Sequence, residues 1–264
     1  MKNEILSRLP ASYPWRGNIH YFETIDSTNT HAKHMAADGA PHGTVLIADS
    51  QTGGRGRMGR SFYSPADCGI YLSMILRPNC PAQKLMHLTC AVAVAIADGI
   101  QNAVGLRPGI KWTNDLVIGQ KKLGGILTEL SLDSTGNVDY AVVGIGINCN
   151  QTATQFPDEI QHIATSLSIC SGKRIARAAV IANLLVALQH MCNDLQNTEA
   201  ILSRYRRDCI TIGQDISVIC GDEISHGKAL DVDENGALLV RFDDGQISAV
   251  TSGEVSIRGM YGYV

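Results

Sequence analysis

The stretch KKLGGILTELSLDSTGNVDYAVVGIGINC, residues 121–149, predicts the centre of the fold. Two long apolar runs, 121–133 and 138–149, flank the residues Ser-Thr-Gly-Asn, which favour a turn. Such a pair is typical of two neighbouring strands joined by a short connection. The runs are nearly continuous in apolar residues, so we expect a sheet that is buried on both faces.

Strands and helices are mixed along the first 210 residues around this pair. Further strands are expected at residues 18–25, 44–50, 69–77, 109–112 and 116–119. Helices are expected at residues 4–9, 27–38, 81–104, 175–194 and 198–208. Ser27 or Thr28 would cap the second helix, which ends at Gly39, and Pro81 would open the third. The sequence predicts an α+β domain with a mixed sheet flanked by helices.

The pattern changes at about residue 213. Short alternating runs follow at residues 216–220, 223–232, 237–242, 247–252 and 254–259. They are separated by Gly-Asp, Asp-Glu-Asn-Gly and Asp-Asp-Gly, which favour tight β-hairpins. We therefore predict two domains, residues 1–210 and a small C-terminal β-barrel of residues 211–264.

Composition excludes several classes of protein. The 264 residues carry a net charge of −3, so no global field attracts nucleic acid or an anionic membrane. The N-terminus has no long apolar run, and residues 88–100 are too short to span a bilayer. The eight cysteines lack metal-site spacing and are expected to be scattered, reduced thiols, as in a cytoplasmic protein.

Residues 51–60, QTGGRGRMGR, cannot contribute to a core although they lie between two predicted buried strands. Three glycines and three arginines fall within Gly54–Arg60. Glycine lets backbone amides approach an anion, and guanidinium groups bind carboxylate or phosphate in a bidentate manner. A solvated arginine loop or an RNA-contacting segment would have the same composition, so the loop alone does not decide between these interpretations.

Four other polar elements accompany the loop. They are DSTNTHA at 26–32, KWTND at 111–115, KKLGGIL at 121–127 and GIGINCN at 144–150. Each has an ordinary structural explanation: a helix N-cap, a polar turn, a solvated hairpin lysine and a buried amide bonded to backbone. Their combination and order carry more information than any one of them.

Taken together, these elements resemble the biotin–protein ligases. That family has Ser-Thr-Asn, then Gln before Gly-Arg-Gly-Arg-x-Gly-Arg, Lys-Trp-Pro-Asn-Asp, Lys-Leu-x-Gly-Ile-Leu and Gly-x-Gly-Ile-Asn. The matching residues here are Ser27–Asn29, Gln51 with Gly54–Arg60, Lys111–Asp115, Lys122–Leu127 and Gly144–Asn148. The resemblance is strong over residues 20–150 and weaker through Ala164–Leu167 and Gly253–Arg258.

The resemblance implies a catalytic domain like that of class II aminoacyl-tRNA synthetases and an SH3-like C-terminal barrel. It implies an ATP-dependent biotin–[acetyl-CoA-carboxylase] ligase, which makes biotinyl-5′-AMP and then biotinylates one lysine of a biotin carboxyl carrier protein. ATP, Mg²⁺ and biotin are the expected ligands. A carboxylate brought against a triphosphate crowds negative charge together, which the cations of this sequence would offset.

Residue roles follow by position from the resemblance. The biotin site would comprise Ser27, Thr28, Asn29, Gln51, Gly54, Arg55, Gly56, Arg57 and Lys122. The ATP site would comprise Arg57, Arg60, Lys111, Asn114 and Asn148. Arg57, Lys122 and Asp115 are the catalytic candidates, and the metal ligands stay open. The Gly/Arg loop would act as a lid that keeps water from the reactive adenylate.

Two positions depart from the family pattern, and two alternatives stay open. Thr113 replaces a usual proline, which predicts a less rigid turn, and Phe62 replaces a common tryptophan.

Only 25 residues precede Asp26, so no DNA-binding domain is expected. A lipoate or octanoate ligase would share the architecture, and a non-enzymatic binder, either an RNA-binding protein or an inactive biotin scaffold, belongs to another class. Monomer and homodimer are both compatible with the sequence.

Overall fold

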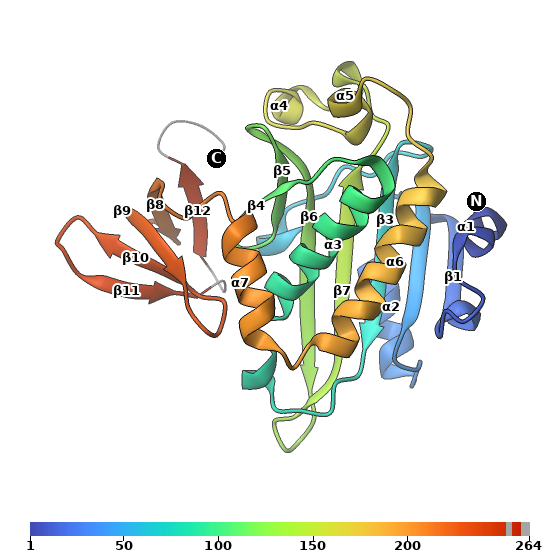
Figure 1. Cartoon of the computed structure of the whole chain (residues 1–264), viewed down its shortest axis with the longest axis horizontal. Coiled ribbons are helices and arrows are strands. Elements are labelled where there is room, and N and C mark those ends of the chain that lie inside the picture. The colour runs from blue at the N-terminus through green and yellow to red at the C-terminus, as the bar shows by residue number, and fades with distance from the viewer. Residues whose placement is uncertain (252–254, 260–264) are drawn as a thin grey trace.

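The apolar hairpin forms β6 (Lys121–Leu132) and β7 (Val138–Asn148) near the middle of a seven-stranded sheet. The strand order is β1-β2-β3-β7-β6-β5-β4 (Figure 1). β1 and β2 are parallel and the other neighbours are antiparallel, so the sheet is mixed as predicted. The computed structural model describes residues 1–251 and 255–259, the last five as backbone only.

The predicted strands and most of the helices are present. The other strands of the large sheet are β1 (Ile19–Ile25), β2 (Thr44–Gln51), β3 (Gly69–Leu76), β4 (Gly109–Lys111) and β5 (Asp115–Ile118). The longer helices are α1 (Lys2–Arg8), α2 (Thr28–Ala37), α3 (Leu88–Val104), α6 (Arg177–Asp194) and α7 (Thr198–Asp208). Two short helices were not predicted, α4 (Asp158–Gln161) and α5 (Leu167–Ser171).

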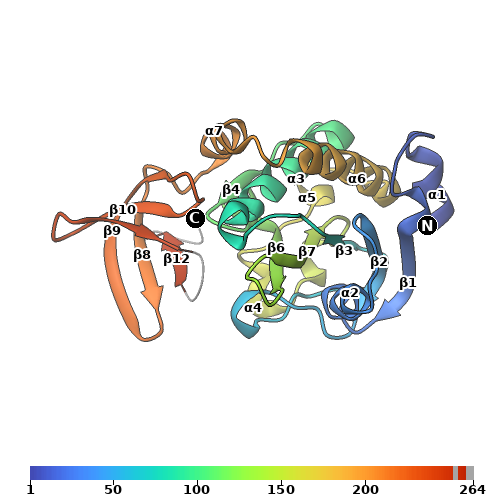
Figure 2. The ribbon, with the colours of Figure 1, turned by 90° about the horizontal axis from the view of Figure 1, so that it is seen from below.

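Helices cover both faces of the large sheet. Figure 2 shows α3, α6 and α7 on one side and α2 on the other. Gly99 lets α3 and α6 approach closely, since a Cβ atom there would lie 2.9 Å from the Leu184 Cα. β3 is buried along its whole length, as expected for a strand covered on both faces.

The expected helix at residues 81–104 is wrong at its start. Pro81 precedes a 3₁₀ turn, Ala82–Leu85, and the α-helix begins only at Leu88. His87 adopts φ −80° and ψ 0° between them, and its ring Nε2 lies 2.9 Å from the Leu195 carbonyl oxygen. This long-range contact accompanies the break in a stretch whose sequence pattern is continuous.

One segment of the described residues, Ala82–Val104, is long and apolar enough to cross a membrane. In this fold 67% of its most apolar window is buried inside the protein. α3 lies on the sheet beside α6 and also contacts α7, and its apolar side chains form much of the core (Figure 1). Its composition therefore has a structural explanation within the domain.

The C-terminal residues form a second, antiparallel sheet in the order β11-β10-β9-β8-β12. Its strands are β8 (Asp215–Cys220), β9 (Glu223–Val232), β10 (Leu238–Phe242), β11 (Ile247–Val250) and β12 (Val255–Gly259). The start of the last expected strand, Gly253 and Glu254, lies outside the described residues. This small sheet beside a helix-flanked mixed sheet confirms the predicted fold class.

Candidate functional site

The Gly/Arg loop folds as a short hairpin. The amide of Gly56 donates to the Arg60 carbonyl (2.7 Å) and the amide of Phe62 donates to the Gly54 carbonyl (2.9 Å). A Cβ atom at Gly54 would lie only 2.4 Å from the Phe62 carbonyl oxygen, so this close crossing requires glycine. The tip is the 3₁₀ turn Arg57–Gly59. These contacts therefore give the arginine-bearing loop a defined backbone shape.

A neutral hydrogen-bonded group lies where β2 ends and α2 begins. The Ser27 side chain caps α2 by accepting from the Thr30 amide (3.4 Å). The amide and hydroxyl of Thr28 both donate to Gln51 Oε1, at 2.8 and 3.0 Å. Gln51 Nε2 in turn donates to Ser64 Oγ (2.9 Å). These contacts orient the Thr28 and Gln51 side chains.

Asn29 lies buried beneath this group. Its Nδ2 donates to the Leu127 carbonyl (3.3 Å) and to Glu129 Oε2 (3.0 Å), and Ser73 Oγ donates to its Oδ1 (2.6 Å). A Cβ atom at Gly144 would lie 2.1 Å from Asn29 Oδ1, so the amide rests directly on the β7 backbone. Asn29 thus links α2 to β3, β6 and β7.

The turn between β4 and β5 carries three polar residues of the site. Asn114 Oδ1 accepts from Arg57 Nη1 (3.0 Å), which ties the hairpin tip to this turn. Lys122 Nζ donates to Asp115 Oδ1 (2.6 Å) and Lys111 is buried nearby. Burial lowers the pKa of the Arg57 guanidinium, while Asp115 opposes the shift and Arg60 adds to it.

These elements enclose one cavity of about 970 Å³, its open mouth included. Three kinds of residue line it: neutral polar groups at one end, cations along the hairpin and the turn, and backbone-exposing glycines. They include Ser27, Thr28, Asn29, Gln51, Arg55, Gly56, Arg57, Arg60, Lys111, Asn114, Asp115, Lys122, Gly125, Gly144 and Gly146. Five cations face one carboxylate within this described lining, so the cavity favours an anionic ligand.

Two of the sequence-predicted residues do not line the cavity. Gly54 lies behind the hairpin against Phe62 and Ser64. Asn148 is buried and its Nδ2 donates to the Thr165 carbonyl (3.0 Å). Thr165 is next to Ala164, which forms a bridge with Lys122. Asn148 therefore supports the segment that pairs with Lys122.

The two departures from the family pattern have clear places. Thr113 is buried, its peptide bond with Trp112 is cis, and its carbonyl accepts from the Tyr205 hydroxyl (3.3 Å). The Phe62 ring lies over Gly146, where a Cβ atom would meet it at 2.6 Å. Phe62 therefore forms one wall of the cavity.

Sequence reasoning missed Ser73 and Glu129. Ser73 is completely buried and its hydroxyl lies 2.8 Å from Thr28 Oγ1. Glu129 forms ion pairs with Lys33 (2.8 Å) and Arg55 (3.6 Å). A signal for Ser73 was present, since a small polar residue interrupts an otherwise apolar strand. Glu129 carried no comparable signal, because its partners are remote in sequence.

Two protein-family models match the chain. The model of the Biotin/lipoate A/B protein ligase family matches residues 21–148, and that of the Biotin protein ligase C terminal domain matches residues 211–258. The bifunctional ligase/repressor BirA of Bacillus spizizenii is 39% identical over 242 residues, covering 91% of this chain and 74% of the relative.

A further relative and a solved structure extend the comparison. The biotin–[acetyl-CoA-carboxylase] ligase of Mycobacterium tuberculosis is 33% identical, covering 93% of this chain and 90% of the relative. The structure of biotin protein ligase from Aquifex aeolicus in complex with biotin and ATP superimposes with a TM-score of 0.78 at 28% identity. It covers 92% of this chain and 99% of the other.

Proposed function

Since the chain belongs to the biotin protein ligase family and is an ATP-dependent biotin–protein ligase, we propose that both of its half-reactions occur in the cavity under the 54–61 hairpin. The observation that carries this placement is the division of the cavity. Neutral hydrogen-bonding groups lie at one end and five cations lie along the rest. The two substrates show the same division, because the ureido ring of biotin is neutral whereas the biotin carboxylate and the ATP phosphates are charged.

The neutral end suits the ureido ring of biotin. A planar urea needs neutral donors and acceptors, which Ser27, Thr28 and Gln51 supply. The Thr28–Gln51 contacts orient both side chains before the substrate arrives. Asn29 and Gly54 would support the site indirectly, because protein contacts hold the Asn29 amide and Gly54 shapes the hairpin.

The cationic part suits adenylation. Arg55 and Gly56 would follow the valeryl chain, while Arg57, Lys111 and Lys122 would hold the carboxylate and the α-phosphate. The carboxylate oxygen attacks that phosphorus, and pyrophosphate leaves with its negative charge offset by Arg57 and Arg60. Binding of the carboxylate and phosphates would hold the hairpin closed as a lid, which excludes water from the acyl-adenylate.

The two asparagines would serve the nucleotide in different ways. Asn114 lines the cavity and binds Arg57, so it can contact ATP directly. Asn148 would act as a positioning residue, because its amide holds Thr165 beside the segment paired with Lys122. The sequence alone did not distinguish these two roles.

Mg²⁺ would enter with ATP. The described residues contain no group of three acidic, histidine or cysteine side chains able to hold a metal. Mg²⁺ keeps several waters and is usually bound by one or two carboxylates together with substrate phosphates. Asp115 is the carboxylate available in the described cavity lining, and it fits that mode of binding.

Transfer to the carrier completes the reaction. The acceptor lysine of a biotin carboxyl carrier protein, from acetyl-CoA carboxylase or a related carboxylase, attacks the acyl carbon, and AMP leaves. Lys122 would polarise the carbonyl, and Asp115 would orient the incoming amine or accept its proton. The net charge of −3 argues against a role for nucleic acid.

The outer edge of β6 offers a surface for the carrier or for a second copy of the chain. Residues 128–132 pair with β7 on one side, and no strand within 1–251 or 255–259 lies on the other. Leu130 and Leu132 are exposed there. A homodimer through this edge is compatible with the fold.

The free thiols of all eight cysteines suit a cytoplasmic location.

Intact mass of a carrier domain tests the proposal. The protein is incubated with carrier, ATP, Mg²⁺ and either biotin, lipoate or octanoate. One biotin adduct is expected with wild type, and its loss is expected for Lys122→Ala. Lys121→Ala is the matched control, because that neighbouring lysine is exposed and outside the cavity. An adduct with lipoate or octanoate alone would assign the protein to the sister family.

A further inference from the structure

The 111–115 turn is held from behind by the C-terminal part of the chain. Trp112 donates twice: its backbone amide to Thr211 Oγ1 (2.9 Å) and its indole Nε1 to the Gly236 carbonyl (2.9 Å). The amide of Ile210 donates to the Ile110 carbonyl (2.9 Å). Two residues of the turn region are thus fixed by a segment about a hundred residues later.

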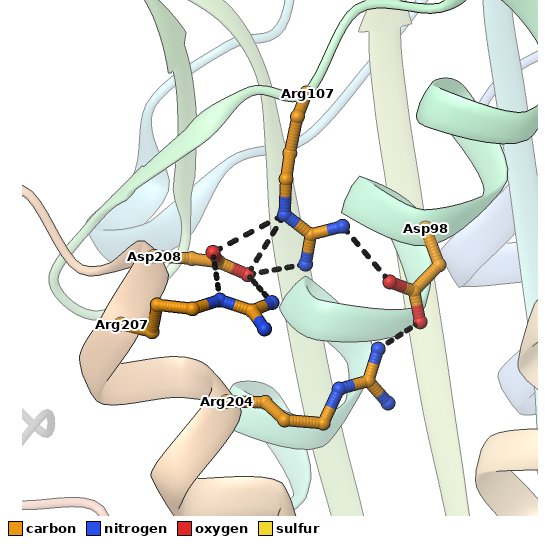
Figure 3. A network of polar contacts seen from close by, with 5 residues as sticks. All are labelled: Asp98, Arg107, Arg204, Arg207 and Asp208. Carbon is orange, nitrogen blue, oxygen red and sulfur yellow. Dashed lines mark hydrogen bonds and ion pairs between the residues drawn. The ribbon is translucent and has the colours of Figure 1, made fainter.

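An ion network joins the segment before β4 to the end of α7, just before both reach this contact (Figure 3). Asp208 accepts from Arg107 Nε (3.2 Å) and Arg207 Nε (3.0 Å), and its side chain is only 7% exposed. Asp98 on α3 binds Arg107 (3.0 Å) and also binds Arg204. Arg107 precedes β4, and Asp208 ends α7. The network therefore fixes the positions from which both segments, the one after Arg107 and the one after Asp208, reach the contact with Trp112.

The acceptor for the indole lies on a rigid turn. Asp233 Oδ1 accepts from the amides of Asn235 (2.9 Å) and Ala237 (2.8 Å), which closes the β9–β10 turn. Gly236 has φ +83°, and a Cβ atom there would lie 3.0 Å from Cys90 Sγ on α3. The turn is consequently wedged against the catalytic domain, with its carbonyl aimed at Trp112.

We propose that Trp112 is a positioning residue through which the C-terminal domain sets the nucleotide end of the cavity. This inference rests on the proposed function. The same short turn carries Lys111, Asn114 and Asp115, which line the cavity together with Trp112 itself. The neutral biotin end is built on α2 and β2, far along the sheet from the C-terminal domain (Figure 1). A loosened contact therefore affects ATP more than biotin.

Steady-state pyrophosphate exchange separates the two substrates. Thr211→Val removes the acceptor for the Trp112 amide at nearly constant volume, and Trp112→Phe removes the indole donor. A buried polar group left without its partner, the Trp112 amide in the first variant and the Gly236 carbonyl in the second, predicts a fall of about tenfold in kcat/KM for ATP. KM for biotin is expected to stay within about twofold. Thr211→Ser keeps the hydroxyl and is expected to retain wild-type values.

Rates are referred to the active fraction, measured by single-turnover adenylate formation, so that poor folding of a variant is not counted as a kinetic effect. Unchanged ATP parameters for Thr211→Val in an active background would overturn this inference alone. Equal losses for ATP and biotin would also overturn it, since they indicate a general structural role. A wild-type protein that shows no biotin-dependent exchange would overturn the proposed function itself.

Discussion

Ser73→Ala tests whether the buried hydroxyl network organises the biotin end of the cavity. The Ser73 hydroxyl is 0% exposed and lies 2.8 Å from Thr28 Oγ1 and 2.6 Å from Asn29 Oδ1. Alanine leaves the buried Asn29 Oδ1 without this donor, which costs about 1–3 kcal/mol. A cost of about 2 kcal/mol lowers Tm by roughly 4–8 °C in a chain of this size.

Loss of this hydroxyl also frees Thr28, which Ser73 helps to hold against Gln51. We therefore expect the Kd for biotin to rise by about tenfold, the equivalent of one buried hydrogen bond. Circular dichroism gives Tm, and calorimetric titration gives the Kd. Ser203→Ala, at an exposed serine of α7, is the matched control. Wild-type Tm and biotin affinity in Ser73→Ala would refute the reasoning.

Three further outcomes are expected. Arg57→Ala should reduce adenylate yield or release biotinyl-5′-AMP into solution, as measured by rapid quench; normal yield and retention would contradict the lid. Gly99→Ala should lower the free energy of unfolding by about 1–3 kcal/mol by forcing α3 from α6, whereas Gly17→Ala, with no atom within 4 Å, should be neutral in the same denaturant titration.

The third outcome in this group concerns Glu129. Burial raises the pKa of its carboxyl, but hydrogen bonds from Lys33 and Asn29 outweigh this and hold the pKa below its ordinary 4.5. Its stabilisation is therefore present above pH about 4.5 and disappears as pH falls through the lower folded value. The stability gap between wild type and Glu129→Gln should shrink below pH 4.5; a gap independent of pH would exclude this origin.

Sequence patterns predicted the fold well where structure follows from local periodicity. Every predicted strand of the large sheet is present, because alternating or continuous apolar runs report burial directly. The break at His87 was not predictable, since its partner Leu195 is 108 residues away. The short helices α4 and α5 were missed for a related reason: few residues give too little periodicity.

The candidate site was predicted unevenly. Charged residues in distinctive motifs, such as Arg57 and Lys122, do line one cavity. Asn148 was expected near the nucleotide, and its Nδ2 donates to the Thr165 carbonyl outside the cavity lining; a motif position does not reveal which way an amide faces. Ser73 and Trp112 form hydrogen bonds with residues far along the chain, and such contacts become visible only once the sheet is assembled.

The floor of the cavity limits how its selectivity can be altered. Gly125, Gly144 and Gly146 line it, and the Asn29 amide and the Phe62 ring already occupy the space where a Cβ atom at Gly144 or Gly146 would stand. No amino acid is smaller than glycine, so a side chain at Gly144 or Gly146 would push Asn29 or Phe62 aside, and no substitution on this floor widens the space. Engineering the protein to accept a bulkier carboxylic acid must therefore start from the hairpin or the rim, while floor substitutions offer a means of excluding substrates.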